Sequence, residues 1–168
     1  QGADAQGSAA RVAAAMLAPL AESAVTEPGV VRMGEHALVR WPQLLAQLPE
    51  PVFFQQNGTL VVWHRQDAAD AARLRLQFET TRTTVPTLPA MEALGSERLT
   101  TLEPALAGRF AQGMYLPGEG QLDNRQLLAA LAHALVQAGV TTHWNTPREV
   151  TDFAPGTAGQ PDWLLDCR

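Results

Sequence analysis

Cysteine is almost absent from this sequence of 168 residues, and its single cysteine, Cys167, excludes both an internal disulfide bond and a zinc site built from several cysteines. We therefore expect a reducing, cytoplasmic location. A long apolar run is missing too. The alanine-rich stretch from 9 to 24 carries Arg11 and Glu22 and is too short and too weakly apolar to cross a bilayer. It also lacks the basic start and long apolar run of a signal peptide.

Clusters of lysine and arginine are absent as well, and the formal net charge is -5. Such a chain has no basic surface for nucleic acid or for an anionic membrane, so neither partner is expected. The hydrophobic content of 46% is that of an ordinary globular protein and is enough for one substantial core. We expect one domain, or one domain with part of another.

Familiar catalytic and metal-binding motifs are also missing. Ser8 and Ser23 do not lie in the Gly-x-Ser-x-Gly turn of many hydrolases, and Gly2 and Gly7 alone do not make a phosphate-binding loop. The histidines share no metal-type spacing with one another or with nearby carboxylates. They are His36, His64, His133 and His143. We therefore assign no catalytic residue and no metal ligand within the chain.

Periodic apolar residues predict several helices. Asp123 is expected to cap the last of them and Gly139 to end it. Leu76 and Phe78 are expected on the apolar face of the third, and Leu135 and Val136 on that of the last. The predicted helices cover 9–23 with a break near Pro19, 34–48 with an interruption at Pro42, 67–81, 97–102 and 124–138.

Strand-forming segments lie between these helices. Residues 52–63 are rich in aromatic and β-branched residues on both sides of Asn57-Gly58, a strong local signal for a hairpin. A strand is expected at 111–116, followed by a turn at 117–120. Three further short strands are predicted at 140–144, 149–153 and 163–167. This alternation predicts an α/β or α+β fold, in which helices flank a mixed or antiparallel sheet.

A resemblance to a known family begins at Ala13-Ala14-Ala15-Met16-Leu17-Ala18-Pro19. This segment resembles the Ala-Ala-Gly-Met-Leu-Ala-Pro stretch of the D-amino-acid oxidase superfamily of FAD-dependent oxidoreductases, and most of all its glycine oxidase branch of thiamine biosynthesis. Ala15 stands where the family usually has glycine, and Arg11-Val12 replaces smaller residues. Further short motifs follow in the family's order: Trp41-Pro42, Asn57-Gly58-Thr59-Leu60, Leu102-Glu103-Pro104, Leu122-Asp123 and Ala138-Gly139-Val140.

The resemblance implies that the chain is an internal piece of a larger enzyme. Gln1 would fall immediately after the acid that holds the adenosine ribose, so the glycine-rich phosphate loop is outside the chain. Residues 1–30 would be a remnant of the FAD-binding domain, 31–122 part of the substrate domain, and 123–168 a return to the FAD-binding domain. We expect the intact parent to bind FAD, and the piece alone to lose it and to be inactive.

The resemblance also implies which residues form one wall of the site. The backbone of the three alanines would approach the flavin ring, while the backbone around Arg148 would approach the adenine. Met16 would also line the substrate, and Ala21 would lie near the substrate entrance. The expected cofactor-binding residues are Ala13, Ala14, Ala15, Met16, Leu17 and Arg148. Arg32, Arg40 and Arg82 are expected on solvated helix faces rather than as substrate anchors, which would lie beyond Arg168.

By the same resemblance, the parent would transfer hydride from the amine-bearing carbon of a small amine or amino acid to flavin N5. Two other functions stay open. One is a D-amino-acid dehydrogenase of the same superfamily that passes electrons to quinone. The other is a non-catalytic interaction module that keeps the scaffold, suggested by Ala15 and by the missing nucleotide loop. Assembly as a homo-oligomer is also left open.

Overall fold

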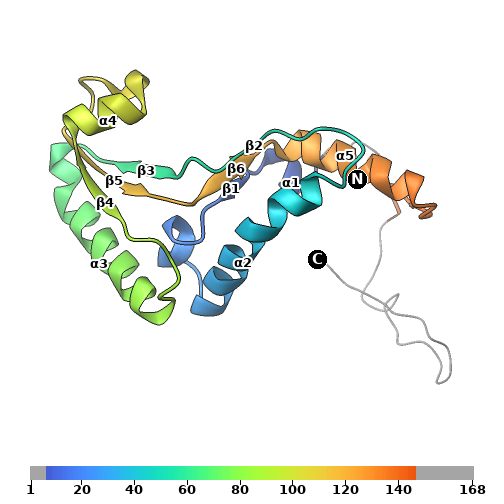
Figure 1. Ribbon diagram of the computed structural model, residues 1–168, viewed down its shortest axis with the longest axis horizontal. Helices are drawn as coiled ribbons and strands as arrows, with labels where there is room; N and C mark the ends of the chain where they lie inside the picture. Colours follow the sequence, from blue (N-terminus) through green and yellow to red (C-terminus); the bar gives the residue numbers. More distant parts are fainter. Residues whose placement is uncertain (1–6, 147–168) are drawn as a thin grey trace.

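The computed structural model describes residues 7–146, which form two small antiparallel sheets joined end to end with helices against them (Figure 1). One sheet has the order β1-β6-β2 and the other the order β3-β5-β4. The strands are β1 (Met16–Leu17), β2 (Phe54–Gln55), β3 (Thr59–Val62), β4 (Glu92–Gly95), β5 (Gln112–Leu116) and β6 (Gly120–Leu122). The helices are α1 (Ala9–Val12), α2 (Pro28–Leu45), α3 (Ala68–Thr84), α4 (Ser96–Leu102) and α5 (Asn124–Gln137). Short 3-10 helices cover Ala21–Ala24 (η1), Arg65–Asp67 (η2) and Pro104–Leu106 (η3). The predicted combination of helices with antiparallel strands is confirmed.

The two sheets share one long antiparallel ribbon. Phe54 lies opposite Leu122 in the first sheet, and Thr59 lies opposite Leu116 in the second, so the same two chain segments pair in both. The ribbon is interrupted where Gly58 takes a φ of 83° and donates its N–H to the carbonyl of Glu119 at 2.8 Å. Residues 53–62 and 112–123 therefore form a central ribbon that contributes two strands to each sheet.

The predicted hairpin around Asn57-Gly58 is wrong, because its two arms pair with β6 and β5 and not with each other. Gly58 has the left-handed backbone that a hairpin turn needs, but it lies where the ribbon is interrupted between the β2–β6 and β3–β5 pairings. Each arm instead pairs with a segment that is distant in sequence. Long-range pairing therefore overrides the local turn signal.

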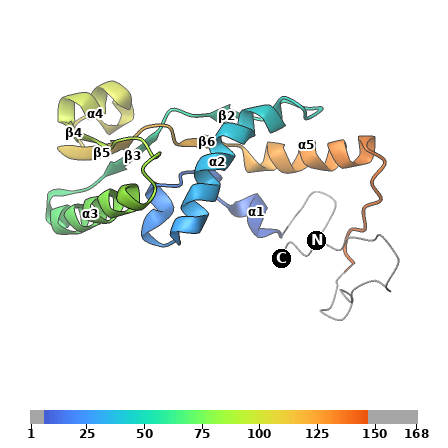
Figure 2. The same ribbon diagram turned by 60° about the horizontal axis from the view of Figure 1, so that its bottom comes forward.

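Helices α3 and α4 cover opposite faces of the sheet β3-β5-β4 (Figure 2). Successive residues of a strand point to opposite faces. Gly113 leaves room for Leu99 of α4, whose Cδ2 would lie 2.9 Å from an added Cβ. Met114 instead belongs to the core with Phe78 of α3. The main core lies on that side; its buried residues are Leu20, Val31, Phe78, Val85, Leu88, Met114 and Leu116.

Helix α3 has the predicted position, but not every predicted core residue is buried. Ala71 and Phe78 are buried, whereas Leu76 is 64% exposed. Helix α4 ends at Leu102, before Glu103-Pro104, as predicted. Helix α2 differs more from its predicted bounds of 34–48, because it begins at Pro28 and ends at Leu45. Proline fits the first turn of a helix because its missing N–H would have no partner there.

The alanine-rich segment 9–23 does not form the predicted helix. Helix α1 ends at Val12, Ala13 is extended with a ψ of 150°, and Ala15 has a φ of 57°. Met16 and Leu17 then pair with β6. The helix propensities of ordinary residues differ by less than about 1 kcal/mol, so the pairing of β1 with a distant strand overrides them.

Helix α5 is fixed at its start by Asp123, whose Oδ1 accepts hydrogen bonds from the N–H groups of Arg125 and Gln126 at 2.9 Å. The predicted cap is confirmed, as is the stop near Gly139, which has a φ of 70°. On the apolar stripe, however, Leu135 and Val136 are exposed, and the fully buried residue is Ala130. These two positions were predicted wrongly.

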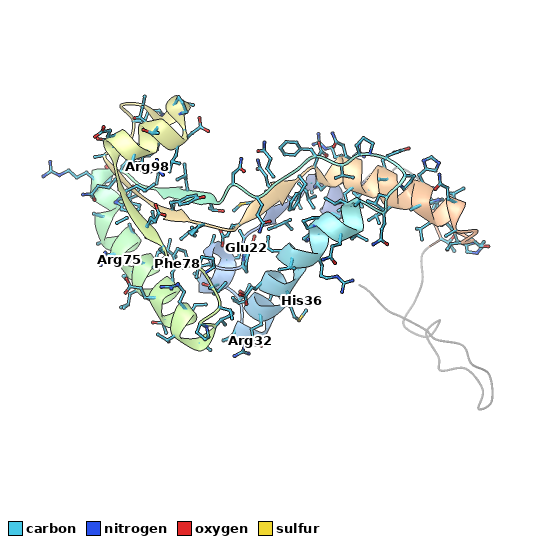
Figure 3. All side chains as sticks on the ribbon, viewed as in Figure 1. Glu22, Arg32, His36, Arg75, Phe78 and Arg98 are labelled. Atoms are coloured by element: carbon cyan, nitrogen blue, oxygen red, sulfur yellow. The ribbon has the colours of Figure 1, made fainter. Side chains whose placement is uncertain are left out.

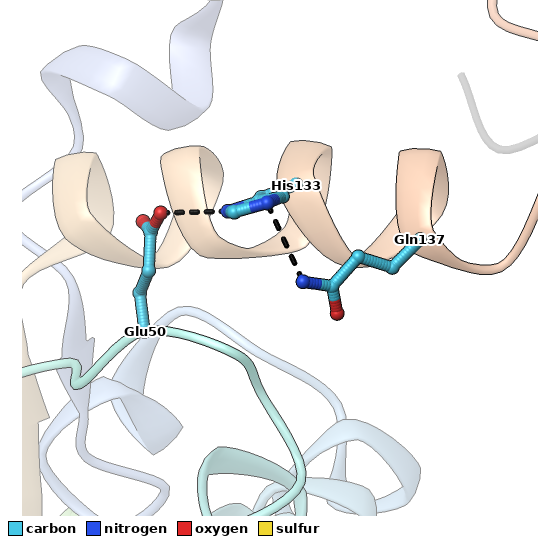
Figure 4. Close-up of polar contacts among 3 residues, drawn as sticks. All are labelled: Glu50, His133 and Gln137. Atoms are coloured by element: carbon cyan, nitrogen blue, oxygen red, sulfur yellow. Dashed lines mark hydrogen bonds and ion pairs between the residues drawn. The ribbon is translucent and has the colours of Figure 1, made fainter.

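Helix α5 is also tied to the segment after α2. His133 Nδ1 lies 2.7 Å from Glu50 Oε1, and Gln137 Nε2 lies 3.4 Å from the other ring nitrogen of His133 (Figure 4). The histidine thus joins α5 to residues far from it in sequence. No helix within 7–146 combines the length and the hydropathy needed to span a membrane.

Beyond α5, residues 140–144 are not a strand. An extended segment becomes a strand only when another segment bonds to it, and none of the described residues pairs with this one. The strands predicted at 149–153 and 163–167 lie outside the described residues, as does Cys167.

We predict that Gly58→Ala destabilises the protein by about 2 to 3 kcal/mol, because it combines a left-handed backbone with a clash. The new Cβ would lie 2.2 Å from Cε2 of Tyr115, whose hydroxyl donates to the carbonyl of Asn57 at 2.9 Å. Urea unfolding measures the loss. Gly108→Ala is the control, since Gly108 has a φ of 70° but no atom within 4 Å of an added Cβ. Equal losses in the two variants would contradict the packing at Gly58.

Candidate functional site

The candidate site centres on residues 13–17, which run along one edge of the sheet β1-β6-β2. Ala13 and Ala14 are exposed, and Ala15 is half-buried with its φ of 57°. Met16 lies opposite Gln121 and Leu17 opposite Gly120 in the adjacent strand β6. The segment therefore presents an exposed backbone with small side chains, followed by two apolar residues held in a sheet.

The first residue of α5 holds this segment from one side. Asn124 Nδ2 donates a hydrogen bond to the carbonyl of Ala13 at 2.8 Å and another to the carbonyl of Ala10. The N–H of Leu122 donates to the carbonyl of Ala15 at 3.3 Å. Because Asp123 caps α5, the cap fixes Asn124 and, through it, the alanine segment.

Met16 lies between two grooves and is 43% exposed. The first groove, of about 140 Å³, is mainly apolar and separates Met16 from the side chains of α2, including Val30 and Trp41. The second, of about 200 Å³, is more polar and runs between Met16 and the bend of the ribbon, with Gln55 and Gln121 in its wall. Met16 thus contributes to both sides of a partly open surface.

Beyond Leu17 the chain turns into the protein and is held there by Glu119. Oε1 of Glu119 accepts hydrogen bonds from the N–H of Leu20 at 2.8 Å and from the N–H of Ala21 at 2.9 Å. The glutamate is only 3% exposed, and no described residue donates to its Oε2. Ala21, the predicted residue of the substrate entrance, is therefore fixed through its backbone.

Burial raises the pKa of Glu119 above its ordinary value of 4.5, because the carboxylate loses contact with water. The polar side chain of Thr59 and the N–H groups of Ala21 and Leu20 lower the pKa and partly oppose this effect. The negative charge of Glu22 adds to the rise. Glu22 itself is exposed at η1, between α2 and α3 (Figure 3). The neutral form of Glu119 is thus favoured relative to an exposed glutamate.

Sequence reasoning placed Glu119 only in a turn and gave it no role. A single acid between two glycines predicts that the backbone bends there, but its hydrogen-bond partners, Leu20 and Ala21, are distant in sequence. Asn124 was likewise missed as a contact of the alanine segment. Arg32 and Arg40 are exposed on α2, as predicted, while Arg82 is half-buried and donates to the carbonyl of Leu88 at 3.4 Å. Arg148 lies outside the described residues.

Comparison with known proteins gives three related findings. The family model described as DAO, FAD dependent oxidoreductase, matches residues 1–162. A Rhizobium etli protein that carries the name thiamine biosynthesis oxidoreductase ThiO is 35% identical over 126 residues, which are 75% of this chain and 34% of that protein. Glycine oxidase from Geobacillus kaustophilus is 27% identical, with a TM-score of 0.66 over 80% of this chain and 36% of the enzyme.

A second solved structure, iminodiacetate oxidase from Chelativorans sp. BNC1, has a TM-score of 0.65 at 20% identity and covers 80% of this chain and 37% of its own. This likeness shows the shared fold. The chain thus matches only about a third of the length of each of these relatives.

We predict that Ala15→Gly stabilises the protein by about 0.5 to 1 kcal/mol, because glycine adopts a φ of 57° without the strain that a Cβ causes. Ala15→Val should destabilise it, since a β-branched residue fits this backbone poorly. Urea unfolding of the three proteins tests the order. A valine variant as stable as the glycine variant would show that Ala15 is not left-handed.

We also predict a pH-dependent difference between the wild type and Glu119→Gln. The pKa of Glu119 is higher in the folded protein than in the unfolded chain, so the neutral carboxyl stabilises the fold below pH 4.5. This stabilisation is lost as the pH rises through the pKa of the folded state. Glutamine cannot titrate. The free energy of unfolding of the wild type should therefore fall relative to that of Glu119→Gln between acid and neutral pH. A constant difference would contradict the burial of Glu119.

Proposed function

We propose, from the fact that this chain belongs to the family of FAD-dependent oxidoreductases, that it forms one wall of the flavin and substrate site in a longer enzyme. This enzyme oxidises a small amine or amino acid. The observation that carries the proposal is the partly exposed segment from Ala13 to Leu17, in which the residues that resemble the family's flavin-side motif lie together at a sheet edge.

The names of the relatives support the class of substrate. The 27% identical structure is a glycine oxidase, and the 35% identical protein is named for thiamine biosynthesis. Glycine is the smallest amino acid, so a site of this kind suits a small amine that carries a carboxylate. We propose glycine or a similarly small amine for the parent of this chain.

The residues present fit the ring of FAD but not its diphosphate. Ala13 and Ala14 end at Cβ, so a flat ring can approach their backbone closely, and no charged side chain occurs from 12 to 21. Met16 adds a flexible apolar surface that adapts to an aromatic ring. No Gly-x-Gly-x-x-Gly loop is present in the sequence, so the diphosphate would be held by other parts of the enzyme.

When bound, FAD accepts the hydride from the substrate. We propose that the backbone of Ala13, Ala14 and Ala15 orients the ring, that Met16 and Leu17 exclude water beside it, and that Ala21 lines the path of the substrate. The backbone around Arg148 would approach the adenine. Since protein groups mainly orient the reactants in such enzymes, these residues act by position and shape.

We further propose that residues 1–30 and 123–168 belong to the FAD-binding domain and that 31–122 belong to the substrate domain. The bonds from Asn124 to Ala10 and Ala13 support a common unit for the first two parts. Helix α1 also lies beside the start of α5, away from α3 and α4 (Figure 1). The alanine segment would then lie near the boundary of the two domains.

We predict that the full-length protein, purified with FAD, has a flavin spectrum and releases peroxide when glycine is added. Ala14→Phe should weaken FAD binding by about tenfold or more, because the ring would meet a bulky side chain at an exposed position. Ala69→Phe, at an exposed position of α3, is the control and should change nothing. Fluorescence titration with FAD measures both.

Full-length protein without bound flavin, or with equal FAD affinity in both variants, would contradict the proposed site. Oxidation of glycine that needs an added quinone and consumes no oxygen would instead identify a dehydrogenase. Oxygen consumption without an added acceptor separates these two enzymes.

A further inference from the structure

Glu119 contacts the chain just after the residues proposed to line the flavin. Its Oε1 accepts two hydrogen bonds from consecutive N–H groups, those of Leu20 and Ala21, at 2.8 and 2.9 Å. Both donors are separated from it by nearly 100 residues, 99 and 98 positions. Hydrogen bonds to a carboxylate are stronger than those between neutral groups, so this contact fixes the turn with one side chain.

The backbone around the same glutamate binds two other segments. Its carbonyl accepts the N–H of Gly58 at 2.8 Å, and the next residue, Gly120, lies opposite Leu17 in the sheet. One short turn therefore joins β1, the residues that follow it and the bend of the ribbon. A displacement of Glu119 would move these together.

The burial of Glu119 costs free energy, because its carboxylate loses contact with water. The side chain is 3% exposed, and no described residue donates to its second oxygen. Glutamine would accept the same two hydrogen bonds through its amide oxygen without a charge to desolvate. Glutamine at this position would therefore keep the contact with Leu20 and Ala21, whereas alanine would remove it.

We propose that Glu119 is a positioning residue, which holds strand β1 and Ala21 in place and so sets how Met16 contacts the flavin and how the substrate enters. This inference rests on the proposed function, because it concerns the same site. It adds a residue that touches neither flavin nor substrate in the proposal and acts through the backbone of Leu20 and Ala21.

Hydrogen exchange of the full-length protein tests the contact itself. In Glu119→Ala, the amides of Leu20 and Ala21 should exchange about tenfold faster, since each loses its acceptor, while the amide of Leu116 in the core stays protected. Glu119→Gln should stay close to the wild type. Glu97→Ala, which removes an exposed glutamate from α4, is the charge-matched control and should change neither amide. Unchanged exchange at Leu20 and Ala21 in Glu119→Ala would overturn the proposal.

The bound flavin and the kinetics test the positioning role. Glu119→Ala should shift the visible spectrum of the flavin and raise KM for the amine by about tenfold, with a smaller change in kcat, and Glu119→Gln should restore most of both. A variant that loses only thermal stability, with the same spectrum and KM, would show a structural role and overturn the proposal.

The two proposals can fail separately. A wild-type protein that binds no FAD contradicts the proposed function, and the positioning role fails with it, although the exchange data still establish the contact. A wild-type protein that binds FAD and oxidises glycine, together with a Glu119→Ala variant of unchanged spectrum and KM, contradicts only the role of Glu119.

Discussion

The pairing of residues 53–62 with residues 112–123 is the constraint on which the rest of this structure depends. It supplies the central strand and one edge strand of each sheet, β6 with β2 in one and β5 with β3 in the other. It places Met114 and Leu116 in the core with Phe78 of α3. It also brings Gly120 opposite Leu17 and so forms the edge on which the alanine segment lies. Without this ribbon, the residues from 13 to 17 would have no sheet to hold them.

The ends of helices could be predicted from sequence wherever they depend on neighbouring residues. Asp123 binds N–H groups two and three residues away, and Glu103-Pro104 ends α4 by its own geometry, so both were predictable from sequence. Asn57-Gly58 shows where such prediction fails. The left-handed glycine is present, but the partner of each arm is a distant segment, which the local sequence does not specify.

The candidate site follows the same division. The motif from Ala13 to Leu17 could be recognised from its order of residues, although it is not helical: Ala13 is extended and Ala15 is left-handed. Glu119 and Asn124 could not, since their partners are distant in the chain. Ala15 combines both cases: its identity departs from the family's glycine, and yet its backbone has the left-handed φ that glycine adopts most easily. The left-handed backbone at this position is thus compatible with alanine at a modest strain.

The central claim is that the backbone from Ala13 to Ala15 lies against the flavin ring of the complete enzyme. A crystal structure of the full-length protein with FAD tests it most directly. The account predicts atoms of these residues within about 4 Å of the ring, with Met16 beside it. A ring bound far from this segment, or a segment covered entirely by other protein, would contradict it.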